Sequence, residues 1–424
     1  MMRSVKGTRD IIDTRLWNFL LRMIRAHCEQ YHFTEIITPI LEHAELFRRS
    51  VGQETDIVGK EMYFVCSEHD IQDRSLCLRP EITASVMRAF LEHDIQTIPW
   101  KVFTYGPCFR HERPQKGRYR EFYQISVEMI GSASPLQDVY FLTMLDRFFH
   151  EKLHLDTYAL TINFLGCNDD RIRFKEVLRE YLEKNIASLC AQCLERKERN
   201  ILRVLDCKNT VCKSLYEKGP CVTDYLCTVC TAEWVLIQQA LQQLSVSYTL
   251  MPLLVRGLDY YGKIVFEFVS VDGALGAQST FCAGGRYDKL AQELGNTKEV
   301  PALGAALGID RILLMLEGIQ DRFFALKQQE GFLVAILPLG EHESALSLHI
   351  ADMLQAKGLT VEPLLDGGSL KSMMRRADRL GAHFCVIIGP DELASHMVTV
   401  KNMKTGTEER MKQTELVDHI RAAT

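Results

Sequence analysis

The sequence lacks any long apolar segment. No apolar run approaches the roughly 18 uncharged residues that a membrane-spanning helix needs. The opening MMRSVKGTRD is polar and has no apolar signal-peptide core behind it. These absences argue against a membrane protein and against an exported one. We therefore expect a soluble protein, and we place it in the cytoplasm.

A strong excess of positive charge is also absent. The chain has 50 Lys and Arg residues against 55 Asp and Glu residues, which gives a formal net charge of -5. Proteins that bind nucleic acid through overall attraction normally carry a basic domain or stripe. The charge balance therefore argues against DNA binding of that kind, and any contact with RNA must be local.

Common nucleotide-binding loops are missing as well. The sequence has no Walker A loop, and the glycines of GALGAALGID do not match the pattern G-x-G-x-x-G. Any nucleotide must therefore bind by another route. Internal repeats and low-complexity segments are absent too.

The composition is that of an ordinary globular protein of 424 residues, with 47% hydrophobic and 25% charged residues. Helical periodicity from Thr14 to Tyr31 is followed by the β-branched segment FTEIITP, which predicts a helix and then a strand. Helical patterns at EITASVMRAFLEH and SPLQDVYFLTMLDRFFHEKL separate further strand-like segments, namely WKVFTYGPCF, FYQISVEMI, TYALTINFL and KIVFEFVSV. This order predicts an α+β fold with a large, mainly antiparallel sheet.

Two changes of pattern indicate domain boundaries. Residues 167–243 are charged, cysteine-rich and mostly helical in periodicity, so we expect an inserted helical subdomain, after which core strands resume at MPLLVRGLDYYG. This insert interrupts a first large domain over residues 1–325. After Arg322, strands and helices alternate from FLVAILP to MVTVKNM, which predicts a small α/β domain with a mixed sheet over residues 331–424.

A cationic hairpin is the most informative stretch. In FRHERPQKGRYREFYQISVEMIG, five Arg or Lys residues lie between two strand-like segments. Period-two alternation predicts that Arg110 and Glu112 share one strand face, while Gln124 and Glu128 point together on the returning strand. Arg110 with nearby Phe122 could hold the phosphate and the base of a nucleotide. The alternative is a solvated charged turn on the surface.

Several longer motifs resemble those of a known protein family. The chain resembles class II aminoacyl-tRNA synthetases over almost its entire length: Thr14 to Pro39 is similar to motif 1, FRHE to the start of motif 2, and GAALGIDRILLML to motif 3. VRGLDYYGKIVFEF, CAGGRYDKL, LRPE and KGTRD resemble the signatures of the histidyl-tRNA synthetases in particular. Two strings depart from the family: LRPEITA stands where relatives usually read LRPEGTA, and DYYGKIVFEF where they commonly read DYYTGTVFEF.

The resemblance implies an activity, cofactors and partners. A histidine–tRNA ligase activates histidine with ATP, in the presence of Mg²⁺, to histidyl-adenylate and pyrophosphate. It then transfers histidine to the 3′-terminal adenosine of tRNA(His). The family also implies a homodimer formed through motif 1 and anticodon reading by residues 331–424. For anticodon reading, the residues themselves offer only a basic helical patch of Lys371, Arg375, Arg376 and Arg379, which a solvated face would match equally well.

The resemblance also implies roles for individual residues. Arg256 and Arg110 would be catalytic, with Arg256 touching both the histidine carboxylate and the α-phosphate. ATP would be bound by Arg110, Glu112, Arg118, Phe122 and Arg311, with Phe122 and Arg311 on either side of the adenine. Histidine would be bound by Glu81, Thr83, Arg110, Gln124, Glu128, Arg256, Tyr260, Tyr261 and Tyr287.

The fourteen cysteines include two metal-type pairs. Cys190-x-x-Cys193 and Cys227-x-x-Cys230 could together close a structural zinc site, and Cys207, Cys212 and Cys221 lie between them. The gap between the pairs is longer than the usual roughly 15 to 20 residues. The alternative is a set of free thiols on a helical insert, as a reducing compartment allows.

Three other functions compete with ligation. The non-catalytic, histidine-sensing regulatory paralogue of ATP phosphoribosyltransferase shares this catalytic fold but normally lacks the last domain. Synthetases for proline, threonine or glycine share the class motifs but not RGLDYY. A purely RNA-binding role would leave the carboxylates Glu81 and Glu128 unexplained.

Overall fold

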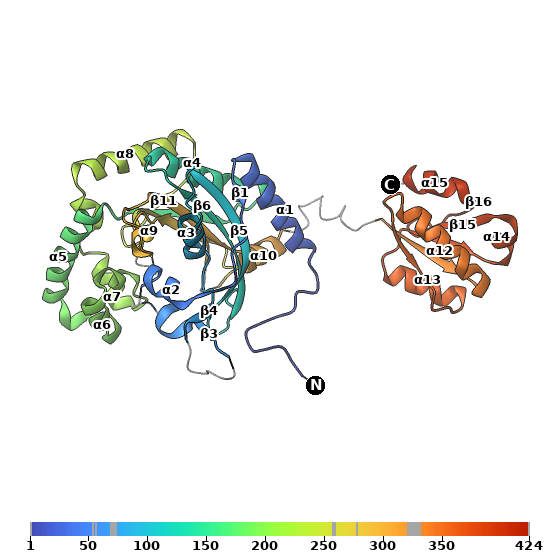
Figure 1. Cartoon of the computed structure of the whole chain (residues 1–424), viewed down its shortest axis with the longest axis horizontal. Coiled ribbons are helices and arrows are strands. Elements are labelled where there is room, and N and C mark those ends of the chain that lie inside the picture. The colour runs from blue at the N-terminus through green and yellow to red at the C-terminus, as the bar shows by residue number, and fades with distance from the viewer. Residues whose placement is uncertain are drawn as a thin grey trace. The chain divides into compact units, whose positions relative to one another are not determined.

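A computed structural model describes residues 2–52, 55, 57–67, 74–256, 260–276, 279–319 and 332–422. The chain divides into two compact units, residues 1–320 and 321–424 (Figure 1). No described helix has the length and apolar character that a membrane span requires.

The described strands of the first unit form an eight-stranded sheet in the order β1-β5-β6-β11-β10-β9-β7-β8. Its pairs are antiparallel except for β1 with β5 and β7 with β8, at the two edges. The expected antiparallel α+β fold is confirmed. The strands are β1 Thr34–Glu35, β5 Trp100–Phe109, β6 Glu121–Ile130, β7 Tyr158–Phe164, β8 Thr249–Leu250, β9 Gly262–Ser270, β10 Thr280–Arg286 and β11 Ala302–Gly308.

Helices cover both faces of this sheet. Helix α3, Thr83–Glu92, packs its buried Val86 and Met87 into the same core cluster as Val102 of β5 and Val265 of β9. The opposite face meets α4, Pro135–Arg147, where the Phe141 ring lies 6.4 Å from the ring of Phe266. The remaining helices near the sheet are α1 Arg15–Gln30, α2 Ala44–Ser50, α9 Leu290–Glu293 and α10 Ile309–Glu317, and a small sheet is formed by β2 Leu41–His43, β4 Leu76–Leu78 and β3 Tyr63–Val65.

Two central strands were not predicted from the sequence. β10 and β11 are rich in glycine and alanine, residues that carry little strand signal. The glycines are needed for space, since a Cβ at Gly304 would overlap the Glu128 carboxylate and one at Gly284 would overlap the Gly304 carbonyl. The prediction that core strands resume at MPLLVRGLDYYG was wrong: β8 ends at Leu250 and β9 begins only at Gly262. Residues 257–259 lie outside the described residues.

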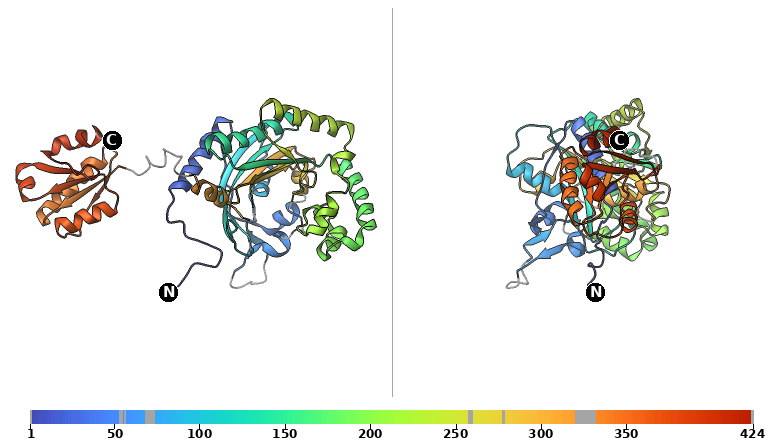
Figure 2. Two further views of the ribbon diagram at one scale, coloured as in Figure 1. Left: turned by 180° about the vertical axis from the view of Figure 1, so that it is seen from behind. Right: turned by 90° about the vertical axis from the view of Figure 1, so that its right-hand side faces the viewer.

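The segment between β7 and β8 is helical where it was expected to be. It contains α5 Asn168–Lys184, α6 Ala191–Arg199, α7 Thr210–Tyr216 and α8 Thr228–Gln243, joined by the 3-10 turns η3 Ile186–Ser188, η4 Ile201–Asp206 and η5 Val222–Tyr225. Helices α5, α6 and α7 gather beside one side of the sheet (Figure 1), and α8 lies along α4 in both views (Figure 2). We call residues 167–243 the insert.

The second unit has the mixed sheet that was expected, in the order β13-β12-β14-β15-β16. β12 is parallel to β13 and β14, and β15 is antiparallel to both of its neighbours. The sequence did not predict β16, α14 or α15. The elements are β12 Leu333–Pro338, α12 Glu341–Gln355, β13 Thr360–Pro363, α13 Leu370–Arg379, β14 Phe384–Ile388, α14 Pro390–Ser395, β15 Met397–Asn402, β16 Glu408–Lys412 and α15 Leu416–Ala422.

Candidate active site

Glu128 lies at the centre of the sheet face that α3 covers. Its strand partner is Gly304, whose missing side chain leaves room for the carboxylate. One carboxylate oxygen, Oε1, accepts from the Thr83 hydroxyl at 2.7 Å and the Ser126 hydroxyl at 2.6 Å, and the other accepts from the Tyr287 hydroxyl. Burial raises the pKa of Glu128 to about 8, although these three donors oppose the shift. A fully buried carboxyl group is thus held by three hydroxyls of the described residues.

Glu81 stands beside it at the start of α3. Its two oxygens accept from the backbone N–H groups of Thr83 at 2.7 Å and Ala84 at 2.9 Å, which places its negative charge at the positive end of the helix. Burial nevertheless raises the pKa of Glu81. Two buried carboxylates therefore face the same space, because Thr83 bonds to both Glu81 and Glu128.

Three tyrosines close this space. Tyr260, Tyr261 and Tyr287 are all buried, and their ring centroids lie 4.6 to 6.4 Å apart. Tyr287 donates to Glu128, so its hydroxyl has a defined partner. Gln124 lies on β6 two residues before Ser126, on the same face of the strand. Its side chain is half-buried and accepts a hydrogen bond from the Cys108 thiol at 3.6 Å. These side chains combine aromatic rings with hydroxyl and amide groups.

Arg256 borders the tyrosines from the other side. Its Nη1 donates to Glu267 Oε1 at 2.6 Å, and its guanidinium carbon lies 5.5 Å from the centre of the Tyr261 ring. Its Nε is buried and has no hydrogen-bond partner among the described residues. An unpaired buried donor is costly, so this guanidinium is suited to an anionic ligand. Glu267 belongs to the motif VRGLDYYGKIVFEF, but no role was predicted for it.

The cationic hairpin brings further guanidinium groups to the same sheet face. Arg110 donates from Nε to the Pro80 carbonyl at 2.9 Å, and its guanidinium lies 5.1 Å from the centre of the Phe122 ring. Arg311 of α10 donates to the carbonyls of Gly117 and Thr280. Burial first, and then the charges of Arg118 and Arg110, lower the pKa of Arg311 to about 10. Cations close enough to lower the pKa of Arg311 in this way favour a polyanionic ligand.

One geometric detail of the hairpin differs from the prediction. Arg110 and Glu112 do not sit on a strand face, because β5 ends at Phe109 and both residues belong to the loop that follows. The Glu112 carboxylate pairs with Arg118 instead of lying beside Arg110. Gln124 and Glu128 do share one face of β6, as period two predicts.

Comparisons with known proteins agree with these motifs. Residues 13–312 match the family "Histidyl-tRNA synthetase", and residues 333–423 match "Anticodon binding domain". A "Histidine--tRNA ligase" from Clostridioides difficile is 38% identical over 99% of both chains, and one from Aquifex aeolicus is 41% identical over 98% of this chain and 100% of its own. The apo histidyl-tRNA synthetase of S. aureus superposes with a TM-score of 0.82 at 30% identity, covering 99% and 100% of the two chains.

The chain belongs to the histidyl-tRNA synthetase family.

The regulatory alternative is not better supported. A Bacillus halodurans structure titled "ATP phosphoribosyltransferase regulatory subunit/histidyl-tRNA synthetase" has a TM-score of 0.62 at 19% identity, a likeness that shows the fold alone. The histidyl-tRNA synthetase resemblance seen in the sequence is therefore confirmed, while the roles of single residues stay predictions.

Sequence reasoning missed two ion pairs beside this histidyl-tRNA synthetase site, of which the first is buried. Arg286, next to Tyr287, pairs with Asp138 at 2.7 Å, and both side chains are at most 2% exposed. Arg9 of the KGTRD motif pairs with Asp310 of α10 at 2.5 Å, and Asp310 also accepts from the Tyr123 N–H. Spacing could not have revealed these contacts, since each joins segments more than a hundred residues apart.

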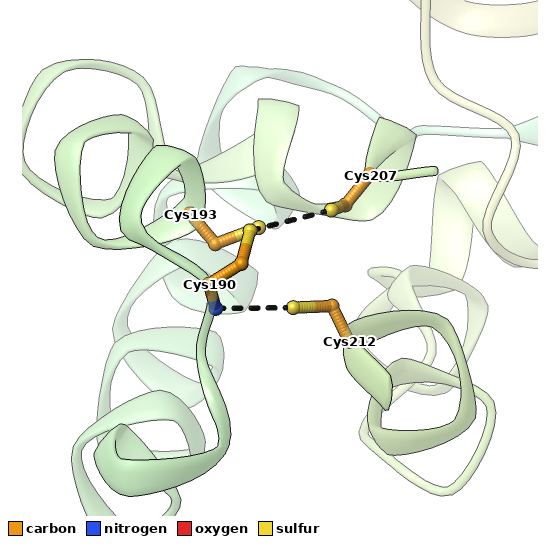
Figure 3. A group of neighbouring side chains, drawn as sticks. All are labelled: Cys190, Cys193, Cys207 and Cys212. Atoms are coloured by element: carbon orange, nitrogen blue, oxygen red, sulfur yellow. Dashed lines mark hydrogen bonds between the residues drawn. The ribbon is translucent and has the colours of Figure 1, made fainter. Parts of the chain in front are cut away.

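The structure does not bring the two C-x-x-C pairs together, so the zinc site considered for Cys190, Cys193, Cys227 and Cys230 does not form as one group. Cys190 and Cys193 converge with Cys207 and Cys212 (Figure 3). The second pair, Cys227 and Cys230, instead converges with Cys167 and Asp170. The long gap between the pairs already argued against this pairing, and the two pairs lie at the starts of different helices, α6 and α8.

A basic groove runs between the insert and the histidyl-tRNA synthetase pocket. It encloses about 380 Å³, and Arg256 and Tyr261 of the pocket form part of its lining. Its cationic lining comes mainly from the insert: Arg171, Lys175, Arg179, Lys197, Arg199 and Arg203, with Lys289 from outside the insert. This is the local concentration of positive charge that the overall charge of -5 does not reveal.

Replacing Glu128 by Gln should change the pH dependence of stability. Because the folded pKa, about 8, lies above the ordinary 4.5, this group's stabilising contribution is complete below about pH 4.5 and is lost as the pH rises through 8. Between pH 5 and pH 8, the free energy of unfolding should therefore fall less steeply with pH in Glu128→Gln than in the wild type. The difference in slope should be up to about 1.4 kcal/mol per pH unit. Guanidinium unfolding followed by tryptophan fluorescence measures this, since Trp17, Trp100 and Trp234 all lie in the first unit.

The exposed Glu29→Gln is the matched control and should follow the wild type. If Glu128→Gln also followed the wild type across this range, the raised pKa would be refuted.

Proposed function

We propose that this chain is a histidine–tRNA ligase: it activates histidine with ATP and esterifies the 3′-terminal adenosine of tRNA(His). One observation carries the proposal. The fully buried carboxyl group of Glu128 is linked through the rings of Tyr287 and Tyr261 to Arg256. Arg256 in turn lines the basic groove. The carboxyl group suits a small polar amino acid, and the guanidinium group suits the phosphates of a nucleotide.

Glu128, Tyr261 and Tyr287 hold the imidazole in this proposal. An imidazole ring needs a partner at each of its nitrogens, and the pocket offers a carboxylate and hydroxyls in a dry environment. An amino acid without such a ring would leave these buried groups unpaired, at about 1–3 kcal/mol per group. The acceptors for the ammonium group of histidine are Glu81, Thr83 and Gln124, and Tyr260 packs behind the ring.

The cationic side binds ATP. Arg110 binds the α-phosphate, and Arg311 and Arg118 bind the outer phosphates. Phe122 stacks on the adenine, and its ring centre lies 5.1 Å from the Arg110 guanidinium, so base and phosphate sites adjoin. Mg²⁺ prefers carboxylate oxygens, and Glu112 and Glu267 supply this type of ligand beside the arginines. When bound with ATP, Mg²⁺ offsets the negative charge of the phosphates.

The chemistry proceeds in two displacements. A carboxylate oxygen of histidine attacks the α-phosphorus, the bond to the bridging oxygen breaks, and pyrophosphate leaves with its electron pair. Arg256 and Arg110 reduce the repulsion between the two anions and stabilise the charge on the phosphoryl oxygens, so no general base is needed. The 3′-hydroxyl of the terminal adenosine then attacks the activated carbonyl, and AMP leaves.

Two surfaces suit tRNA. The basic groove opens onto Arg256, so it can carry the acceptor end to the pocket. In the second unit, a shallow hollow is lined by Lys371, Arg375, Met374, Lys401 and Met403, which combine charge for phosphates with apolar surface for bases. We assign anticodon reading to this unit. Within the patch on α13, Arg376 pairs with Asp366 at 2.5 Å.

We also propose a homodimer in the cytoplasm. Apolar side chains around motif 1 are exposed in the single chain, among them Ile12 at 95%, Ile37 at 89% and Leu41 at 45%. Such a group of exposed apolar residues is typical of a surface that a partner covers. All fourteen cysteines are free thiols, which suits a reducing compartment.

Charging of tRNA tests the proposal directly. The purified chain, labelled histidine, ATP and Mg²⁺ should convert tRNA(His) to the acid-stable, base-labile ester, and a tRNA of another identity should remain uncharged. If the chain binds histidine but forms no ester, the proposed ligase activity is wrong and the regulatory alternative is favoured.

Arg256→Ala should abolish adenylation while leaving the fold intact. Histidine-dependent ATP–pyrophosphate exchange should fall about 10²- to 10³-fold, because the group acts on charge that develops in the transition state. ATP affinity should change little, since the other arginines remain. Arg410→Ala, which removes a cation bonded to Ser395 in the second unit, is the control and should keep full exchange. Unchanged exchange in Arg256→Ala would refute its role.

Removing cations from the groove should separate the two half-reactions. The double variant Lys175→Ala/Arg179→Ala should raise the KM for tRNA. The slope of log KM against log salt concentration should become smaller by about one for each phosphate contact that is lost. Histidine-dependent exchange should stay at the wild-type rate. The control, Lys213→Ala/Lys218→Ala, removes two exposed cations of the insert that do not line the groove. Equal effects of both pairs would contradict the assignment.

A further inference from the structure

Four cysteines of the insert converge on one point. Cys190 begins α6, Cys193 lies in its first turn, Cys207 follows η4, and Cys212 lies in α7. All four sulfur atoms lie within 4.8 Å of one another, and the sulfurs of Cys190 and Cys207 are 3.8 Å apart (Figure 3). We call these residues the cysteine cluster.

The distance between the Cys190 and Cys207 sulfurs matches a tetrahedral metal site, and the other sulfurs are close enough to join it. Zinc–thiolate bonds of about 2.3 Å at tetrahedral angles place neighbouring sulfurs roughly 3.8 Å apart. A disulfide would require about 2.05 Å, and every cysteine of the chain is a free thiol. Three members of the cluster, Cys193, Cys207 and Cys212, are buried, so their thiols face one another and not solvent.

Backbone donors already point at these sulfurs. The Cys190 N–H donates to the Cys212 sulfur at 3.3 Å, and the Asn209 N–H donates to the Cys207 sulfur at 3.4 Å. Hydrogen bonds of this kind favour the negatively charged thiolate, which is the form that binds metal. The cluster therefore offers the ligand number, the distances and the electrostatic support of a closed site.

We infer that the cysteine cluster binds one structural Zn²⁺ in the insert. Four protein ligands leave no open position for water or substrate, so the site is structural and not catalytic. Binding replaces the four thiol protons by one metal ion, and the protons pass to solvent. A small helical subdomain gains from such a cross-link, because its own apolar core is limited.

The cross-link would fix one wall of the basic groove. The cluster joins α6, η4 and α7, and the first two carry the groove residues Lys197, Arg199 and Arg203. The role of the zinc site in tRNA binding rests on the proposed function, whereas the metal site itself does not. Loss of zinc should therefore affect tRNA charging more than histidine activation.

The second cysteine group provides a contrast. Its carboxylate, Asp170, already accepts from the Cys167 N–H at 3.2 Å, the Cys227 N–H at 2.9 Å and Arg173 at 2.5 Å. The sulfur of Cys227 caps α8 by accepting from the Cys230 N–H. This group is accounted for as a pair of helix caps, and its cysteines serve as the matched control.

Metal analysis of the full-length protein, purified under reducing conditions without metal-affinity steps, tests the inference. We expect one zinc per chain, absent from Cys207→Ser/Cys212→Ser and retained in Cys227→Ser/Cys230→Ser. Absence of zinc from the wild type, even after incubation with zinc and gel filtration, would overturn the inference. Loss of zinc only from the control variant would also overturn it.

Cobalt provides a readout that does not depend on the folding of a variant. Co²⁺ added to metal-depleted wild type should give the intense visible bands and near-ultraviolet charge-transfer bands of a tetrahedral thiolate site, and zinc should abolish them. Weak octahedral bands alone would contradict a four-thiolate site.

The same depleted protein then tests the functional consequence. Histidine-dependent exchange should be retained, whereas tRNA charging should fall and recover with zinc. Failure of the proposed function would remove exchange and charging from the zinc-loaded protein while leaving the cobalt spectrum intact, so the two failures are distinguishable.

Discussion

The burial of the Glu128 carboxylate constrains the rest of the catalytic unit. A carboxyl group with no access to water must be surrounded by hydrogen-bond donors, and here Thr83, Ser126 and Tyr287 provide them. The neighbouring strand must give up its side chain at Gly304 to make room. Tyr287 is in turn held by the adjacent Arg286, whose buried pairing with Asp138 ties β10 to α4. Several segments far apart in sequence thus serve one pocket.

The second constraint is electrostatic repulsion between guanidinium groups. Arg110, Arg118 and Arg311 stand close enough for the first two to lower the pKa of the third. Without a ligand, repulsion between these guanidinium groups destabilises the folded protein. A bound polyphosphate would relieve the repulsion, so its binding would be favoured. Arg256 differs, because Glu267 partly neutralises it and its Nε keeps an unused donor. The buried carboxyl groups of Glu81 and Glu128 and the guanidinium groups thus lie in neighbouring regions of the same unit, which suits the proposed reaction between an amino acid and ATP.

The sequence predicted the elements whose residues have strong local preferences. β5, β6, β7 and β9 are rich in aromatic and β-branched residues, and α3 and α4 follow helical periodicity, so each was found near its true position. β10 and β11 were missed because their glycines and alanines are selected by neighbours across the sheet, which a local pattern does not show. The family motifs drew attention to Glu128, Tyr287 and Arg256, whose roles stay predictions, but not to their partners Asp138 and Glu267. The actual grouping of the cysteines, Cys190 and Cys193 with Cys207 and Cys212, was not predicted, because it depends on which helices pack together.

The central claim is that the pocket selects histidine for adenylation. ATP–pyrophosphate exchange with each of the twenty amino acids, in the absence of tRNA, measures this without any contribution from the groove or the second unit. The account predicts exchange with histidine alone. Exchange with a different amino acid, or none with histidine although histidine binds to the folded protein, would contradict it.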